Sequence, residues 1–376
     1  MAVTPKPSVA AASPYRSAKS LAVTAQEYGF REQDIIKLAA NESRFGPSPK
    51  VFEALAAHRG EFSNYPDTNV TELRELLMEK HHVGAEKLSF GHGSGELLAL
   101  VADAYIAPGD EAIYAEPSFA WYQNATRKNE GVPVAVPVTA GKAVDAAGLL
   151  TAITERTKLI WLCNPNNPTG TVLSPSELTD FLAKVPSRVL VVLDEAYIDF
   201  IEGGYIDTVD FIRQYDNVIL LRTFSKAPGL ASFRIGYGIA QEAIIGELLK
   251  VKLPSNVSMQ AQLAAAASLR DQPYIDEVVR RTAAAREYYY RELSRLGFRY
   301  VRSNTNFILV YTGLDSSFLE QEFLRRAVMI RSGEEYGLPG WMRISIGREE
   351  ENARVIAIFD EIKAQLEKET NQEAVL

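Results

Sequence analysis

The chain has 376 residues, 47% of them hydrophobic, which is enough to bury a large core spread over two or three domains. Its formal net charge is −8 and no basic block stands out, so the composition argues against a nucleic-acid partner. No apolar run reaches the roughly 18 residues of a membrane-spanning helix, and the four histidines lack metal-ligand spacing, so we expect no membrane contact and no metal.

The N-terminus and the cysteine content indicate where the protein works. The first 14 residues contain three prolines among small residues and lack the continuous apolar segment of a signal peptide. We interpret them as a flexible arm. Cys163 is the only cysteine, which excludes an internal disulfide and fits a reducing compartment. A cytoplasmic protein is therefore expected.

The first part of the chain alternates short strands with helices. A short helix is predicted near Tyr15, followed by a strand over 35–40 and a loop rich in glycine and proline over 41–49. Ser48 can cap a helix over 49–58, and apolar spacing predicts another helix over 71–80.

A glycine-rich turn follows the next predicted strand, over 87–90. It reads Gly-His-Gly-Ser-Gly-Glu over 91–96 and precedes a helix over 97–106. Free amides and the helix dipole at such a helix start favour an anion, although a tight turn that needs glycine explains the pattern equally well. Glu96 stands where a dinucleotide-binding fingerprint requires glycine, so we discount that alternative.

The middle of the chain indicates a mostly parallel sheet with helices on both faces. Apolar runs predict strands over 111–114, 132–138, 158–163, 188–193 and 218–221, with helices between them. Ligands of such sheets bind beyond the carboxyl ends of the strands. The polar residues that follow three of these strands are Asn167, Asp194, Tyr197, Ser225 and Lys226.

Lys226 is the centre of this group. A lysine with nearby hydroxyls and a guanidinium, here Arg234, suits a covalent amine nucleophile beside a bound phosphate. A surface loop after a strand would also carry a lysine, but convergence of several polar groups at one sheet edge is harder to explain structurally.

The last part of the chain has a different pattern. A long helical stretch over 262–296 is followed by predicted strands over 298–301, 306–310, 328–330 and 341–347, and by helices over 315–327 and 350–368. Short strands with long helices suggest a separate α+β domain.

Three segments resemble those of fold-type I pyridoxal-phosphate aminotransferases: CNPNNPTG over 163–170, LDEAYIDF over 193–200 and TFSKAPGLASFRIG over 223–236. SPYRSAKSL, ANESRFGPSP, NYPD, AVMIRSG and MRISIG are similar to the histidinol-phosphate aminotransferase branch. The resemblance implies an α/β fold with a mostly parallel seven-stranded sheet and a smaller α+β domain built from both chain ends. We place the N-terminal arm and small-domain segment at 1–48, the large cofactor-binding domain at 49–265 and the C-terminal small domain at 266–376.

The resemblance also implies pyridoxal 5′-phosphate as cofactor and assigns roles around its ring. Lys226 would be the Schiff-base lysine, which also moves a proton on the substrate, and Asp194 would face the pyridine nitrogen. Tyr197 and Asn167 would hydrogen-bond the 3-oxygen of the ring. Phe119 would stack on the ring, where many relatives have tyrosine.

The cofactor phosphate would be held by Ser225, Arg234 and the backbone amides of Ser94 and Gly95. Arginine offers phosphate a bidentate fork that lysine cannot copy. Relatives often have an acidic or amide residue where Gly95 stands. Pro228 and Phe233 also depart from the commonest lysine loop and would lie near the substrate.

Four residues match positions that bind the substrate in the family. Arg343 would bind a substrate anion and Arg331 the phosphate of histidinol phosphate, although both could be ordinary solvent-facing charges. Tyr15 and Tyr65 would lie near the anion, with Tyr65 reaching in from the partner subunit of a homodimer.

The implied reaction transfers the amino group of L-histidinol phosphate to 2-oxoglutarate in histidine biosynthesis. An aromatic amino-acid (phenylalanine or tyrosine) aminotransferase of the same branch is the main alternative. A decarboxylase and a cofactor-binding regulator without turnover are further ones, although no DNA-binding segment supports the last.

Overall fold

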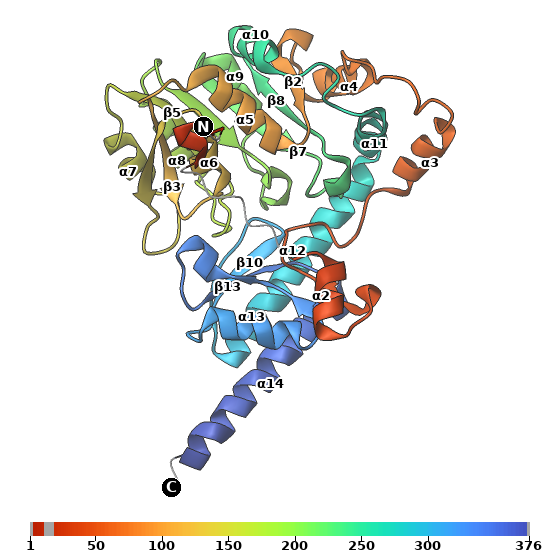
Figure 1. Ribbon diagram of the computed structural model, residues 1–376, viewed down its shortest axis with the longest axis vertical. Coiled ribbons are helices and arrows are strands. Elements are labelled where there is room, and N and C mark those ends of the chain that lie inside the picture. Colours follow the sequence, from red (N-terminus) through yellow and green to blue (C-terminus); the bar gives the residue numbers. More distant parts are fainter. Residues whose placement is uncertain (1–2, 11–18, 374–376) are drawn as a thin grey trace.

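The computed structural model describes residues 3–10 and 19–373 and shows two parts, each built around its own sheet (Figure 1). The larger part contains a seven-stranded sheet, and the smaller part contains a four-stranded sheet near the C-terminus. Within the described ranges no helix is long and apolar enough to cross a membrane.

The seven-stranded sheet is mostly parallel, as the sequence predicts. Its strands run in the order β2-β8-β7-β6-β5-β3-β4, and only β8 is antiparallel to its neighbours. The strands are β2 (Leu88–Gly91), β3 (Glu111–Glu116), β4 (Val132–Pro137), β5 (Thr157–Cys163), β6 (Leu190–Asp194), β7 (Val218–Thr223) and β8 (Gly236–Ala240).

Helices cover both faces of this sheet, which explains its continuous apolar strands. In β5, Leu159 and Trp161 face one core, whereas Ile160 and Leu162 face the other. The first core is completed by α5 (Ser94–Tyr105), α6 (Trp121–Lys128) and α10 (Glu242–Val251). The second is completed by α3 (Pro49–Ala57), α4 (Thr71–His81), α7 (Ala146–Thr151), α8 (Pro175–Leu182), α9 (Val209–Gln214) and α11 (Met259–Leu269).

Strand β8 was not predicted from the sequence, because glycines interrupt its apolar pattern. Gly236 and Gly238 occupy two of its five positions. A Cβ atom on Gly236 would lie 2.7 Å from both the carbonyl oxygen of Arg222 and the amide nitrogen of Ser94. The missing side chain therefore lets β7, β8 and the start of α5 pack closely together.

The smaller part joins both ends of the chain. Strand β1 (Ile36–Lys37), much shorter than the predicted strand over 35–40, pairs in parallel with β11 (Val328–Met329). The antiparallel sheet has the order β12-β13-β10-β9. The strands of this sheet are β9 (Arg299–Val301), β10 (Phe307–Tyr311), β12 (Arg331–Ser332) and β13 (Trp341–Ser345). The smaller part also contains the helices α2 (Leu21–Tyr28), α13 (Ser316–Leu324) and α14 (Glu349–Glu373).

The predicted helical stretch over 262–296 is two helices, α11 and α12 (Gln272–Leu296). The break at Asp271 follows from local chemistry: Pro273 lies in the first turn of α12, and the Asp271 carboxylate accepts a 2.5 Å hydrogen bond from Ser48 Oγ. Helix α12 then connects the two parts of the molecule (Figure 1).

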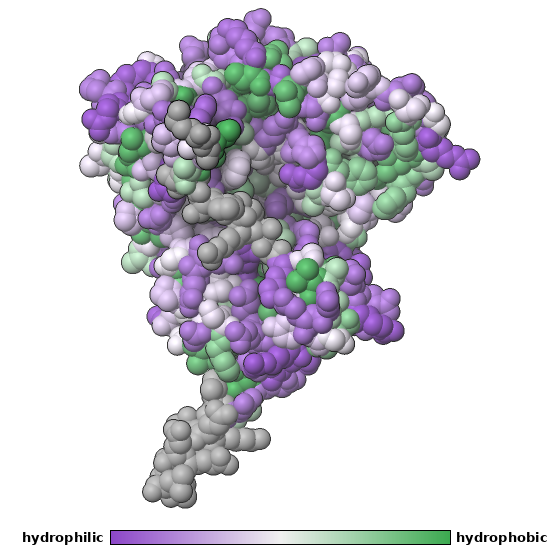
Figure 2. Space-filling view, in the orientation of Figure 1, coloured by the Kyte–Doolittle hydropathy of each residue, from purple (hydrophilic) through white to green (hydrophobic). Residues whose placement is uncertain are grey.

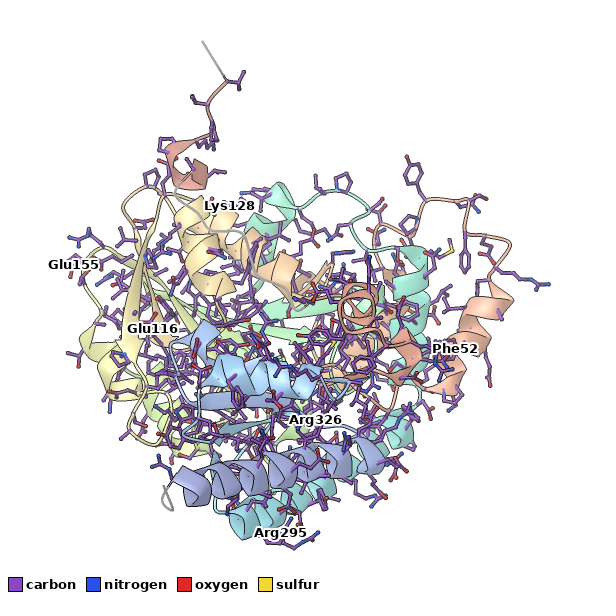
Figure 3. All side chains as sticks on the ribbon, turned by 60° about the horizontal axis from the view of Figure 1, so that its bottom comes forward. Phe52, Glu116, Lys128, Glu155, Arg295 and Arg326 are labelled. Carbon is purple, nitrogen blue, oxygen red and sulfur yellow. The ribbon has the colours of Figure 1, made fainter. Side chains whose placement is uncertain are left out.

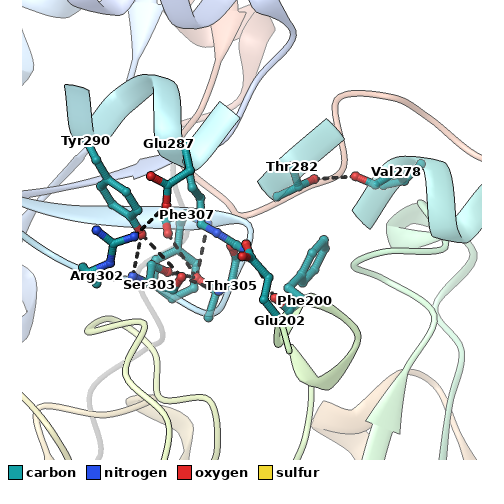
Figure 4. A network of polar contacts seen from close by, with 11 residues as sticks. Phe200, Glu202, Val278, Thr282, Glu287, Tyr290, Arg302, Ser303, Thr305 and Phe307 are labelled. Carbon is teal, nitrogen blue, oxygen red and sulfur yellow. Dashed lines mark hydrogen bonds and ion pairs between the residues drawn. The ribbon is translucent and has the colours of Figure 1, made fainter. Parts of the chain in front are cut away.

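A buried arginine of α12 ties the two parts together. Arg286 is 2% exposed; its guanidinium donates to the carbonyl oxygens of Thr305 (2.7 Å) and Phe200 (3.2 Å) and pairs with Glu202. Figure 4 shows Phe200, Glu202 and Thr305 close together beside helix α12. Because Phe200 belongs to the larger part and Thr305 to the smaller, this side chain satisfies backbone acceptors of both.

We expect Arg286→Leu to lower the free energy of unfolding by about 2 kcal/mol, since two buried carbonyl groups lose their donor. Chemical denaturation measures this change. Arg302→Leu is the matched control, because Arg302 and Glu287 form an exposed ion pair whose loss should cost less than about 1 kcal/mol. Equal destabilisation by the two substitutions would contradict this role for Arg286.

Candidate active site

The carboxyl ends of β5, β6 and β7 open into a cavity of about 450 Å³ between the two parts of the molecule. All but two of the predicted site residues line it. Tyr65 is 90% exposed and does not line the cavity, and Tyr15 lies outside the described residues. The lining residues that the sequence predicts are Ser94, Gly95, Phe119, Asn167, Asp194, Tyr197, Ser225, Lys226, Arg234, Arg331 and Arg343.

Lys226 lies in the turn after β7, where its amine is half-buried at the cavity wall. Its Nζ donates to the carbonyl oxygen of Asn41 (3.2 Å) and lies 5.3 Å from the ring centre of Tyr197. Burial, followed by the positive charges of Arg343 and Arg234, lowers the pKa of Lys226 to about 8. The neutral amine is therefore more populated near neutral pH than in an ordinary lysine, which suits a nucleophile and a proton carrier.

Asp194 is the last residue of β6 and lies at the floor of the cavity. Its Oδ1 accepts from the backbone amide of Ala196 (3.2 Å), and its Oδ2 accepts from the hydroxyl of Tyr122 (2.7 Å). Burial raises the pKa of this carboxyl to about 6, although both hydrogen bonds oppose the change. The floor thus carries a carboxylate that a cationic ring nitrogen would complement.

A polar network connects the cavity floor to the smaller part. Arg343 of β13 donates from Nη1 to Asn167 Oδ1 (2.6 Å) and from Nη2 to the carbonyl oxygen of Ala39 (2.8 Å). Tyr197 OH accepts a 3.1 Å hydrogen bond from Asn41 Nδ2, and burial raises the pKa of this tyrosine. These bonds bring side chains from three distant stretches of sequence into one wall.

One end of the cavity is suited to an anion. Helix α5 begins at Ser94 without a side-chain cap, so its first amide groups can serve a ligand. Arg234 Nη1 lies 3.5 Å from Ser225 Oγ, which also accepts from Thr223 Oγ1 at 3.0 Å. Gly93 has φ +78°, which disfavours other residues, and a Cβ atom on it would lie 2.7 Å from Arg234 Nη2 and displace the guanidinium.

Two more arginines line the cavity from the smaller part. Arg343 is 6% exposed and lies against the rings of Phe307 and Tyr336, and its Nε has no hydrogen-bond partner among the described residues. Arg331 of β12 is 7% exposed and pairs with Glu335 (2.5 Å). A buried guanidinium with an unused donor suits recognition of an anionic substrate.

Comparison with known proteins identifies the family to which this geometry belongs. Residues 33–359 match the model of aminotransferase class I and II. The chain belongs to this aminotransferase family.

Curated relatives of this aminotransferase include histidinol-phosphate aminotransferases. The enzyme of Geobacillus sp. (strain WCH70) is 42% identical over 345 residues, covering 91% of this chain and 93% of the relative. Histidinol-phosphate aminotransferase 2 of Carboxydothermus hydrogenoformans is 39% identical over 356 residues, covering 94% and 97%. The branch predicted from the motifs is confirmed.

Solved structures confirm the predicted fold class. Histidinol-phosphate aminotransferase from Sinorhizobium meliloti, in complex with pyridoxal-5′-phosphate, gives a TM-score of 0.87 at 27% identity and covers 96% of this chain and 97% of that one. Aspartate aminotransferase from Thermus thermophilus with maleate gives 0.83 at 23% identity, covering 96% and 100%, which shows the shared fold alone.

Sequence reasoning did not predict two contacts in the aminotransferase site, those made by Asn41 and by Tyr122. Asn41 lies at φ +55° and contacts both Lys226 and Tyr197. Its position at the start of a loop with Gly46 and two prolines was the available signal, since asparagine tolerates this conformation. Tyr122 carries no such signal, because an aromatic residue in a helix is usually part of the core.

Proposed function

We propose that this aminotransferase transfers the amino group of L-histidinol phosphate to 2-oxoglutarate, forming imidazole acetol phosphate and L-glutamate. The amine-bearing carbon of the donor loses its amino group and a hydrogen and becomes a carbonyl carbon, while the carbonyl carbon of 2-oxoglutarate gives up its oxygen and takes the amino group and a hydrogen, so the two half-reactions balance. The observation that carries the proposal is the pair Arg331 and Arg343, which face the cavity that holds Lys226 and suit a donor with a phosphate. The family relatives of about 40% identity support the same donor.

We further propose that the cavity binds pyridoxal 5′-phosphate. The uncapped start of α5, Ser225 and Arg234 fit its phosphate, and the buried Asp194 carboxylate fits a protonated ring nitrogen. When bound, this cofactor supplies an aldehyde that bonds amines and a ring that accepts an electron pair.

The residues of the chain then have distinct tasks. Lys226, with its lowered pKa, takes up and returns the proton at the donor carbon. Asp194 keeps the ring nitrogen protonated, while Asn167 and Tyr197 hydrogen-bond the 3-oxygen of the ring. Phe119 covers one ring face, and the amides of Ser94 and Gly95 help to hold the phosphate.

Arg234→Lys is expected to weaken binding of pyridoxal 5′-phosphate by about 10- to 100-fold, the effect of losing one or two hydrogen bonds to a charged group. Lysine keeps the positive charge but cannot donate two parallel hydrogen bonds to the phosphate. Fluorescence titration of the apoprotein measures the dissociation constant. Arg299→Lys, on the small sheet, should leave it unchanged, and an unaltered constant in Arg234→Lys would remove Arg234 from the phosphate site.

Steady-state kinetics with different donors tests the function. The proposal predicts a kcat/KM for L-histidinol phosphate at least about 100-fold above those for phenylalanine and tyrosine, because two arginines serve its phosphate. Arg331→Gln should remove most of this preference. A wild-type preference for phenylalanine or tyrosine would identify an aromatic amino-acid aminotransferase instead.

We also propose a homodimer in which Tyr65 reaches the partner's site. Its 90% exposed ring supports this, as do exposed Phe52, Phe62 and Leu253. Phe52 points outward from α3 in Figure 3, and Figure 2 shows apolar surface over the region of α3. Analytical ultracentrifugation tests the dimer; full activity as a monomer would contradict it.

The domain limits 1–48, 49–265 and 266–376 and a cytoplasmic location remain part of this proposal. Separate hydrophobic cores around the two sheets support the division. A role in amino-acid biosynthesis supports the location.

A further inference from the structure

The carboxylate of Asp194 receives a hydrogen bond from a part of the chain that the family motifs do not include. Its Oδ1 is bound by the amide of Ala196 in its own loop. Its Oδ2 is bound at 2.7 Å by the hydroxyl of Tyr122, which comes from α6 on one face of the sheet. The carboxylate is therefore held from two sides.

Tyr122 is held firmly in this position. Its side chain is fully buried; the ring stacks on Trp161 (centres 5.6 Å apart, planes 5° apart) and contacts the edge of Phe119 (5.7 Å, 88°). Thr126 Oγ1 donates to the carbonyl oxygen of Tyr122 and accepts from Trp161 Nε1. The hydroxyl thus has a fixed direction, toward the carboxylate.

The other groups around Asp194 do not replace this bond. On β5, burial raises the pKa of Cys163 to about 12, so its thiol stays neutral. Just after β6, Glu195 follows Asp194 in sequence and its charge disfavours an ionised Asp194, although it pairs with Arg222 of β7. Lys226 favours the ionised form but contributes less than the hydrogen bonds from Tyr122 and Ala196.

We propose that Tyr122 is a positioning residue that keeps Asp194 ionised and directs its carboxylate toward the ring nitrogen of pyridoxal 5′-phosphate. The inference rests on the proposed cofactor but not on the identity of the amino donor. Tyr122 also contacts Phe119, the residue proposed to cover one face of the cofactor ring. One side chain therefore positions both the residue that covers the ring and the carboxylate that faces the ring nitrogen.

Tyr122→Phe tests the proposal, because it removes the hydroxyl and leaves the stacked ring. The readout is the dissociation constant of pyridoxal 5′-phosphate, measured by titrating the apoprotein between pH 5 and 8. A hydrogen bond to the ionised form lowers a pKa, so its loss should raise the pKa of Asp194. Weakening of cofactor binding on acidification should then begin about one pH unit higher than in the wild type, and affinity at neutral pH should fall several-fold.

Three further variants make the result specific. Asp194→Asn shows how binding depends on pH when residue 194 carries no charge, which is needed because the cofactor phosphate also titrates near pH 6. Tyr290→Phe removes another buried tyrosine hydroxyl, which binds Ser303 in the smaller part (Figure 4), and should give the wild-type profile. Tyr122→His keeps an N–H donor on an aromatic ring and should shift the profile less than Tyr122→Phe.

A Tyr122→Phe profile that superimposes on the wild type would overturn the proposal, as would a Tyr122→His profile displaced as far as that of Tyr122→Phe. Because no amino donor is used, failure here is distinguishable from failure of the proposed reaction. Absence of pyridoxal 5′-phosphate binding to the wild type would instead refute the cofactor proposal.

Discussion

Replacing Lys226 with alanine should reduce transamination by about 10⁴-fold, the upper end for loss of a group that transfers a proton. Among the residues that the structure describes, Lys226 is the only lysine that lines the cavity, and its pKa of about 8 suits proton transfer near neutral pH. Neither Asn167 nor Tyr197 can take over, since an amide does not titrate and burial raises the pKa of the tyrosine.

The fold should survive this substitution. Within the described residues, the Lys226 amine makes one hydrogen bond, to the carbonyl oxygen of Asn41, so the free energy of unfolding should change by no more than about 1 kcal/mol. Rapid mixing with L-histidinol phosphate measures the rate, and circular dichroism reports the fold. Lys128→Ala, at an exposed ion pair, should behave as the wild type. Rates in Lys226→Ala within tenfold of the wild type would exclude Lys226 as the proton carrier.

Asp194→Asn is expected to lower kcat by about 10³-fold, the loss typical of removing one buried electrostatic group from an active site. Asparagine keeps the size of the side chain but cannot carry the negative charge that favours a protonated ring nitrogen. It should also weaken cofactor binding, for which the Asp194 carboxylate is the fixed counter-charge.

The pH profile distinguishes this loss of charge from a loss of shape. The pKa of Asp194, raised by burial to about 6, means that the neutral carboxyl accumulates as the pH falls through 6. The affinity of the wild-type apoprotein for pyridoxal 5′-phosphate should therefore decline on that side, and the Asp194 contribution to the decline should vanish in Asp194→Asn. Exposed Asp103→Asn is the control. An Asp194→Asn enzyme that keeps both high activity and this decline would contradict the assigned role.

Much of the site was predictable because the functional side chains follow recognisable strands. Asn167, Asp194 and Lys226 each follow an apolar run, and parallel strands bring their carboxyl ends to one edge. Arg343 was predictable from the family motif only, since nothing in the spacing shows that it reaches Asn167 across the two parts of the molecule.

The remaining features depend on contacts between distant residues. Asn41 meets Tyr197 from a position 156 residues away, and Tyr122 meets Asp194 across 72 residues. Strand β8 was missed because close packing at Gly236 requires glycine, which a local strand pattern counts against. The role of Tyr65 concerns a second copy of the chain, so it stays a prediction.

The most direct test of the central claim is a single half-reaction. Enzyme loaded with pyridoxal 5′-phosphate is mixed with L-histidinol phosphate without 2-oxoglutarate, and the absorbance of the bound cofactor is followed. The proposed function predicts stoichiometric conversion to the aminated cofactor with release of imidazole acetol phosphate, followed by full recovery of the original spectrum when 2-oxoglutarate is added. An unchanged spectrum with L-histidinol phosphate, alongside conversion by phenylalanine or tyrosine, would contradict it.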